Sequence, residues 1–285
     1  VSRAGPATHP TRLPGIAPQP VRSTVRLVLR TVRVTRYVTP LHEGGSLPGL
    51  VEADDDGLYV VKFRGAGQGT AALVAEILVG ELARRLGIRV PELVLVDLDH
   101  QIARREPDPE VQQLLLNSVG LNLGLDFLPG SFGYDSAGWR ADPQEAADLL
   151  WFDEFTANVD RTWRNPNLLV WHKELWAIDH GAALVFQHAW PPVETWAARR
   201  YDLSQHVLRP FAERLDSSAL VATDLRLATA LTGDLIAEAL ALIPDPWLGR
   251  DPDASRLLYT NYLTARLADP RPWWDGPARE EETGA

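Results

Sequence analysis

The sequence predicts an α+β fold, in which a small β-rich N-terminal part with one long helix precedes a mainly helical C-terminal part. Runs of alternating or β-branched residues dominate the first hundred positions. One helical stretch, with a start signal before it and a stop signal after it, interrupts them. From Asp142 onward the apolar periodicity is largely helical, apart from one short hairpin.

Composition narrows the class of protein. The 285 residues are 45% hydrophobic, enough for one large domain or two packed parts. No apolar run approaches the roughly 20 residues that cross a bilayer, and the N-terminus lacks the apolar core of a secretory signal. We therefore expect a cytoplasmic protein with no membrane span. The absence of cysteine excludes disulfides and thiolate metal sites.

Charge is distributed unevenly along the chain. Residues 1–40 contain seven arginines and no acid, whereas the whole chain has a net charge of −10. An acidic body argues against a general nucleic-acid surface, although the basic arm remains available to an anionic partner. We interpret residues 1–20 as a flexible basic tail.

The N-terminal part is predicted to consist of strands joined by turns. Strand patterns cover residues 25–38, 58–63 and 90–97. The turn Gly44-Gly45-Ser46 has two interpretations, either a plain turn or a loop whose N–H groups contact phosphates. Residues 121–128 are mostly apolar and end before Pro-Gly, which indicates a connection between the two parts.

A helix is expected from Thr70 to Leu86, with Thr70 as its cap and Gly87 after its end. Glu76 lies on a small and apolar face of this helix and has no basic residue within four positions, so its carboxylate needs a partner from elsewhere. Lys62, on the preceding strand, is the natural candidate. Only two of the 28 basic residues of the chain are lysines, and the ammonium and guanidinium groups are not equivalent at a tight site.

Helical patterns continue through the second part. Asp142 and Pro143 are typical of a helix start, as Asp108 and Pro109 are earlier. We expect helices at residues 108–119, 142–157, 205–216, 218–230, 233–242 and 252–268.

Residues 158–181 hold the candidate chemistry. Asp160 is followed by Asn165, then by an apolar hairpin, then by Asp179. Each residue alone fits a turn or a strand end. Together they return two carboxylates and an amide to one place, where Asn165 and Asp179 offer oxygen ligands to Mg²⁺ and Asp160 faces an attacking hydroxyl. A zinc site is disfavoured, because the histidines nearby do not have the spacing of common ligands.

The order of these motifs resembles that of the HipA-like kinases, a bacterial branch of the protein-kinase and phosphoinositide-kinase fold. The resemblance covers about residues 30–190 and is closest to the short, single-module members. It rests on Gly44-Gly45-Ser46, Lys62, Glu76, Asp160, Asn165 and Asp179. The chain departs from eukaryotic protein kinases in having Asn-Val before Asp160 and His-Gly after Asp179.

The resemblance implies a two-lobed fold, with an N-lobe at 21–128 that binds ATP and a C-lobe at 129–285. In such kinases the residue at Asp160 is the catalytic base, those at Asn165 and Asp179 hold Mg²⁺, and the lysine at 62, held by Glu76, contacts the phosphates. Gly44, Gly45 and Ser46 would cover the phosphates. The expected acceptor is a protein Ser/Thr hydroxyl.

Three alternatives stay open. The acceptor can be a small-molecule or lipid hydroxyl, since the phosphoinositide kinases share the architecture. The chain can also be a non-catalytic nucleotide-binding or interaction module, because the presence of key side chains does not prove turnover. A hydrolase that uses Asp160 and Asp179 is the third alternative, and it assigns no role to Lys62.

Overall fold

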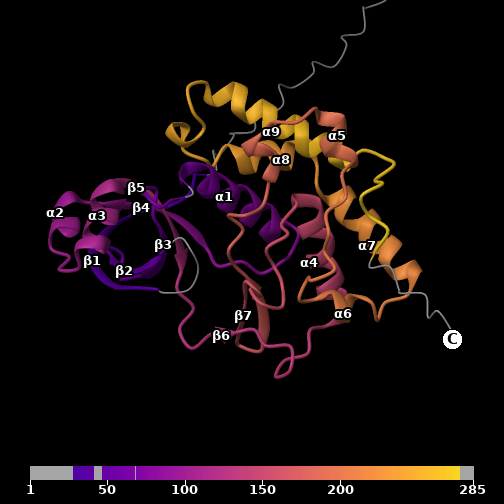
Figure 1. Ribbon diagram of the computed structural model, residues 1–285, viewed down its shortest axis with the longest axis horizontal. Coiled ribbons are helices and arrows are strands. Elements are labelled where there is room, and N and C mark those ends of the chain that lie inside the picture. Colours follow the sequence, from indigo (N-terminus) through magenta and orange to yellow (C-terminus); the bar gives the residue numbers. More distant parts are fainter. Residues whose placement is uncertain (1–27, 42–46, 68, 277–285) are drawn as a thin grey trace, which may run out of the picture.

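The computed structural model describes residues 28–41, 47–67 and 69–276. The predicted tail at 1–20 and the predicted turn Gly44-Gly45-Ser46 lie outside these ranges. Within them, a β-rich N-terminal part and a mainly helical C-terminal part lie on either side of helix α1 (Figure 1). The predicted combination of a β-rich first part and a helical second part is confirmed.

Five strands of the N-terminal part close into a barrel. The neighbouring pairs are antiparallel except β1 and β4, which pair in parallel and close the barrel. In order around the barrel the strands are β1 (Thr31–Pro40), β2 (Gly49–Ala53), β3 (Leu58–Lys62), β5 (Gly120–Asp126) and β4 (Leu93–Leu98). Buried valines of β1 to β4 supply much of its core (Val32, Val34, Val51, Val61, Val94 and Val96).

Strand β5 corrects a sequence prediction. The expected connection at residues 121–128 is wrong for most of that stretch, because the segment up to Asp126 pairs with both β3 and β4. Gly124 makes the pairing possible, since a Cβ there would lie 2.5 Å from Val96 Cγ2. A glycine inside a run of leucines weakens the strand pattern, and only the approach of β4 shows why it is there.

Helix α1 (Gly69–Arg85) joins the two parts of the molecule. It begins one residue before the predicted start and ends at Arg85, two residues before Gly87, whose φ of +84° reverses the chain. Its far side packs against the C-terminal helix α8 (Gly233–Leu240), and Arg85 Nη1 lies 2.6 Å from Glu238 Oε2. The helix that carries Glu76 is therefore held from both sides.

A second tie crosses between the two parts at Arg89, in the loop after α1. Its guanidinium lies 2.9 Å from Glu145 Oε1 and 2.9 Å from Glu174 Oε1. Its carbonyl accepts a hydrogen bond from Ala177 N at 2.8 Å. The end of α1 is therefore fixed to the helix before the candidate site and to the hairpin after it.

The C-terminal part is built around helix α4 (Pro143–Thr156). The Asp142 carboxylate caps its start, as predicted, and Ala157 ends it in the left-handed conformation at φ 55°. A three-stranded sheet lies beside it, of β6 (Phe132–Gly133), β7 (Leu168–Trp171) and β8 (Glu174–Ala177).

The remaining helices agree with the predicted positions in most cases. The expected helix at 205–216 is wrong except for one short turn, α6. The helices outside α1, α4 and α8 are α2 (His100–Arg104), α3 (Pro109–Asn117), α5 (Val193–Ala198), α6 (Arg209–Ala212), α7 (Ser217–Ala230) and α9 (Pro252–Leu267). In the described part of the chain, no helix combines the length and apolarity needed to cross a membrane.

Arg266 fastens α9 to the end of α4. Its buried guanidinium donates to the carbonyls of Glu154, Phe155, Trp196 and Arg199 at 2.7 to 3.0 Å. These carbonyls belong to helix ends, where backbone oxygens lack partners within the helix. One side chain from near the C-terminus thus fixes the point at which the chain leaves α4 for the candidate site.

Candidate active site

Lys62 and Glu76 meet as the sequence predicts. Lys62 is the last residue of β3, and its Nζ hydrogen-bonds Glu76 Oε1 on α1. The same Nζ lies 2.6 Å from Asp179 Oδ1. The side chains of Lys62 and Glu76 are 13% and 1% exposed. One ammonium group therefore joins the barrel, α1 and the segment after the hairpin.

Burial and the neighbouring charges shift the pKa values of Lys62, Glu76 and Asp179 in opposite directions. Burial lowers the pKa of Lys62, but the carboxylates of Glu76 and Asp179 outweigh it and raise the pKa, so Lys62 stays a cation. Burial raises the pKa of Asp179, yet Lys62 brings it below its usual value. The pKa of Glu76 is raised, first by its complete burial. Glu76 Oε2 has no hydrogen-bond partner within the described residues.

Gly181 lets α1 approach this closely. A Cβ at position 181 would lie 3.0 Å from Glu76 Oε1 and 3.5 Å from Ala72 Cβ. That space is tighter than a methyl group normally accepts, so a larger residue would require Glu76 or the segment after Asp179 to shift. The glycine two positions after Asp179 therefore serves the Lys62–Glu76 pair.

Asp160 lies in the loop that follows α4. Its Oδ2 accepts hydrogen bonds from Asn165 Nδ2 at 2.8 Å and from Asn167 Nδ2 at 3.1 Å. Backbone bonds between Thr162 and Asn165, at 3.0 and 3.1 Å, close the turn between them. The amide nitrogen of Asn165, and not its oxygen, therefore faces the Asp160 carboxylate. Asn167 is a contact that the sequence did not reveal.

Asn165 and Asp179 share no hydrogen bond in the described structure, since Asn165 binds Asp160 and Asp179 binds Lys62. Their two segments nevertheless meet nearby: Ile178 N, one residue before Asp179, donates at 3.0 Å to the carbonyl of Asn167, two residues after Asn165. Each side chain uses only one polar atom in these contacts, which leaves Asn165 Oδ1 and Asp179 Oδ2. Amide and carboxylate oxygens are the donors that Mg²⁺ prefers.

The residues present fit a metal ion that is held partly by the protein and partly by the phosphates of a nucleotide. Among residues 28–41, 47–67 and 69–276, no group of three or more His, Cys, Asp or Glu side chains could hold a metal ion. Mg²⁺ commonly takes one or two protein oxygens and completes its shell with water and phosphate oxygens. The donor set of Asn165 and Asp179 fits that pattern.

A buried polar network behind the loop was missed by sequence reasoning. Arg161, which is completely buried, places Nε 2.6 Å from Asp153 Oδ2, and His206 Nε2 lies 2.9 Å from the same oxygen. Arg161 also donates to the carbonyls of Asn167 and Ile178. Burial raises the pKa of Asp153, but Arg161 and His206 lower it to about 2. The sequence did hold a signal for this network. Asp153 is a carboxylate on a mostly apolar stretch of α4, and like Glu76 on α1 it needs a partner from elsewhere in the chain.

His180 belongs to the same network. It is fully buried, and its Nδ1 lies 3.3 Å from Arg161 Nη2. Burial, followed by the charge of Arg161, lowers its pKa to about 3, so the imidazole is neutral. The segment Asp179-His180 therefore meets Lys62 on one side and Arg161 on the other.

Comparison with known proteins places this arrangement in a family. A sequence model described as HipA-like kinase matches residues 34–269. The chain belongs to the HipA-like kinase family. The match extends well beyond residue 190, where the motif resemblance ended, and includes the helices that hold α1 and α4. No curated protein sequence matches the chain.

One solved kinase structure has a similar fold, and two further kinase structures are more distant. The Helicobacter pylori proinflammatory kinase CtkA has a TM-score of 0.50 at 13% identity, over 80% of this chain and 88% of CtkA. Two structures of Golgi casein kinase, one with Mn/ADP bound, have TM-scores of 0.46 at 14% and 13% identity. They cover 84% and 85% of this chain and 72% and 75% of theirs.

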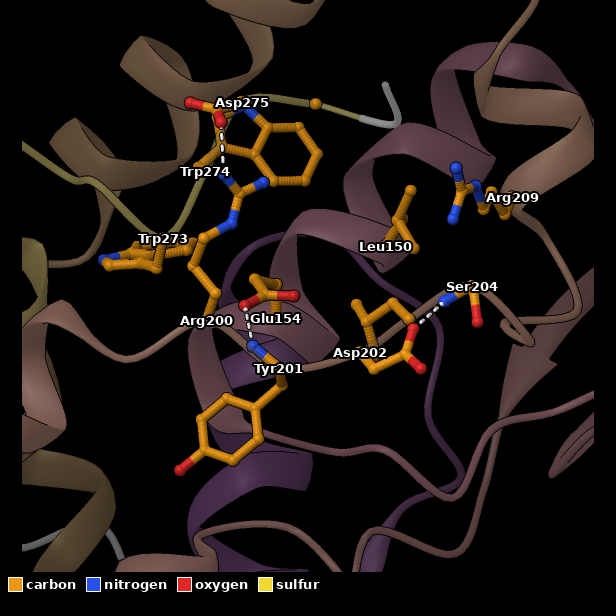
Figure 2. A pocket seen from close by; sticks show the side chains of 12 residues that line it. Leu150, Glu154, Arg200, Tyr201, Asp202, Ser204, Arg209, Trp273, Trp274 and Asp275 are labelled. Atoms are coloured by element: carbon orange, nitrogen blue, oxygen red, sulfur yellow. Dashed lines mark hydrogen bonds and ion pairs between the residues drawn. The ribbon is translucent and has the colours of Figure 1, made fainter. Parts of the chain in front are cut away.

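Figure 2 shows a pocket of this HipA-like kinase, of about 200 Å³, that contains none of the predicted site residues. It lies between α4 and the segment after α5. Glu154 from α4 accepts a hydrogen bond from Tyr201 N at 2.9 Å, and Asp202 accepts one from Ser204 N at 2.8 Å. Burial raises the pKa of Glu154 to about 7, because the Tyr201 N–H and Arg266 offset it only in part.

Replacing Glu154 by glutamine should stabilise the protein above neutral pH. The folded state binds the Glu154 proton more tightly than the unfolded state does. The stability that this proton contributes to the wild type is therefore fully present below about pH 4.5 and is lost as pH rises toward 7. Glutamine keeps the acceptor for Tyr201 and cannot ionise. We expect a gain of about 3 kcal/mol at pH 8 that vanishes near pH 4.5, from 1.36 kcal/mol per pKa unit.

Urea unfolding of the wild type and Glu154→Gln at pH 5, 6, 7 and 8 measures this difference. Asp202→Asn is the control, because Asp202 is an exposed carboxylate of the same pocket. A gain from Glu154→Gln that is the same at every pH would contradict the raised pKa.

Proposed function

We propose that the chain is an ATP- and Mg²⁺-dependent kinase that phosphorylates a Ser/Thr hydroxyl of a protein. The observation that carries the proposal is the contact of Lys62 Nζ with both Glu76 and Asp179, beside a separate loop in which Asp160 binds Asn165. A phosphate-binding cation, oxygen ligands for a metal and a carboxylate that can accept a proton are the parts that phosphoryl transfer requires.

Each residue has a role in the proposed reaction. Lys62, held by Glu76, neutralises charge on the phosphates. Asn165 and Asp179 would hold Mg²⁺, which neutralises phosphate charge when bound. Asp160 orients the acceptor hydroxyl and accepts its proton while the acceptor oxygen bonds to the terminal phosphorus. The bond from that phosphorus to the bridging oxygen breaks, and ADP leaves with the bond's electron pair.

We also propose the two-lobed arrangement with its boundary near residue 128. The last barrel strand ends at Asp126, and Phe132 already pairs with Val170 in the second sheet. The turn Gly44-Gly45-Ser46 would cover the phosphates from the barrel side. In the described residues on either side, Leu41 N donates to Pro48 O at 2.7 Å and joins the end of β1 to the start of β2.

The two lysines of the chain give a matched test. Lys62→Ala should lower kcat/KM for phosphotransfer about 10²–10³-fold, the effect of removing one preorganised stabilising group. Lys173→Ala should change nothing, because Lys173 is exposed in the turn between β7 and β8. The assay is Mg²⁺-dependent ADP formation and ³²P transfer to protein acceptors, with EDTA as the metal-free arm.

The outcomes separate the alternatives. Activity that survives in Lys62→Ala would exclude the kinase and leave the hydrolase that uses Asp160 and Asp179. A wild type without turnover, but stabilised by ATP in thermal unfolding, would be a nucleotide-binding module. Transfer to an added small-molecule or lipid hydroxyl, and not to protein, would change the acceptor class.

A further inference from the structure

An exposed tryptophan lies at the tip of the loop that carries Asp160. Trp163 is 59% exposed, three residues after Asp160, and Val159 directly before Asp160 is 41% exposed. Large apolar side chains are costly to leave in water. Two such side chains on either side of the Asp160 carboxylate indicate that a binding partner covers this surface during the reaction.

The indole of Trp163 is exposed but fixed. Its Nε1 donates to Gln205 Oε1 at 3.0 Å, and its backbone N donates to Gln205 O at 3.2 Å. An antiparallel bridge between Thr162 and His206 continues this contact. The Arg164 guanidinium carbon lies 4.6 Å from the indole centroid. An ordered side chain loses little entropy on binding, so the surface is prepared for a partner.

The shape and chemistry of this surface fit a protein better than a small molecule. Small-molecule sites are concave, whereas Trp163 and Arg164 occupy the tip of a turn. Trp and Arg are also the residue types that contribute most at protein interfaces. Arg164 is exposed and lies over the Trp163 ring, so its charge is available to a partner's acidic group.

We propose that Trp163 and Arg164, held in place by Gln205, form the acceptor-recognition surface of this kinase. It selects a protein segment that has an apolar or aromatic residue, with an acidic residue beside it, close to the phosphorylated Ser or Thr. The inference rests on the proposed function. An extended chain spans at most about 3.6 Å per residue, and Trp163 is three residues from Asp160. The selected side chain therefore lies within about three positions of the acceptor hydroxyl.

A peptide array with a central Ser or Thr and varied flanking residues tests this selection, read both by phosphorylation and by binding of fluorescently labelled protein. For a selected peptide, Trp163→Ala should raise the peptide KM about ten- to thirty-fold, the range for an interface anchor, without a matching rise in the KM for ATP. Trp163→Phe should restore most of the selection. Gln205→Ala should weaken it in part, because the indole is released. Arg164→Ala should remove only the acidic preference.

Leu225→Ala, at an equally exposed apolar position on α7, is the control and should leave the selection unchanged. The proposal is overturned if Trp163→Ala keeps the wild-type pattern, if the KM for ATP rises in parallel, or if a mixed RNA oligonucleotide displaces the peptides. The binding readout requires no turnover. If the wild-type protein binds the selected peptides without phosphorylating them, and Trp163→Ala abolishes that binding, the kinase activity is refuted and the recognition surface is supported.

Discussion

Asp160→Asn is expected to lower kcat for phosphotransfer about 10²–10⁴-fold, the usual contribution of a general base. Asparagine keeps the shape of the side chain, and its carbonyl oxygen can still accept the hydrogen bonds that Asn165 and Asn167 donate. What it removes is the group that accepts the hydroxyl proton. Steady-state phosphorylation of a protein acceptor measures the effect.

Two further measurements show whether the loss is chemical. The rise in melting temperature with Mg²⁺ and ATP should persist in Asp160→Asn, because Lys62, Asn165 and Asp179 remain. Asp202→Asn, in the segment that packs against the catalytic loop, should retain full activity. A variant that keeps wild-type kcat would show that Asp160 is not the base, and a variant that no longer binds ATP would show a structural role instead.

Arg161→Met is expected to destabilise the fold by about 3–5 kcal/mol, the cost of breaking a buried ion pair by removing one partner. With a pKa of about 2, Asp153 is ionised at neutral pH, and it would keep only His206 and Asn158 as hydrogen-bond partners. The carbonyls of Asn167 and Ile178 would also lose a donor. A loss of this size lowers the melting temperature by about 10 °C.

Urea unfolding and calorimetry of the single and double variants measure this cost. Adding Asp153→Leu to Arg161→Met removes the unpaired carboxylate, so the double variant should be more stable than the Arg161 variant alone. A double variant whose loss equals the sum of both single losses would contradict the coupling. Arg256→Met, at a partly exposed arginine on α9, is the matched control and should cost less.

The buried network around Arg161 and the C-terminal helices hold the candidate site in position. Arg161 donates both to the carbonyl of Asn167 and to that of Ile178, and Arg266 fixes the end of α4 before Asp160. On the other side, α8 holds α1 so that Glu76 reaches Lys62. The positions of the proposed catalytic groups thus depend on residues more than fifty positions away in sequence.

The sequence by itself determined the local elements and the key pairing. The caps at Asp108 and Asp142 place two helix starts, because a carboxylate there satisfies free backbone N–H groups regardless of the rest of the fold. Glu76 could be assigned a distant cation, since a carboxylate on an apolar face is costly without one. Lys62 was identified by its strand and by the rarity of lysine.

Only the tertiary structure decided how these elements meet. The closure of the barrel by β1 and β4, the strand at 120–126 and the network of Asp153, Arg161 and His206 join segments that are far apart in the chain. Such contacts depend on which surfaces pack together, and local patterns do not encode that. The sequence determined which groups need partners, and the packing of α1, α4 and the C-terminal helices decided which partners they have.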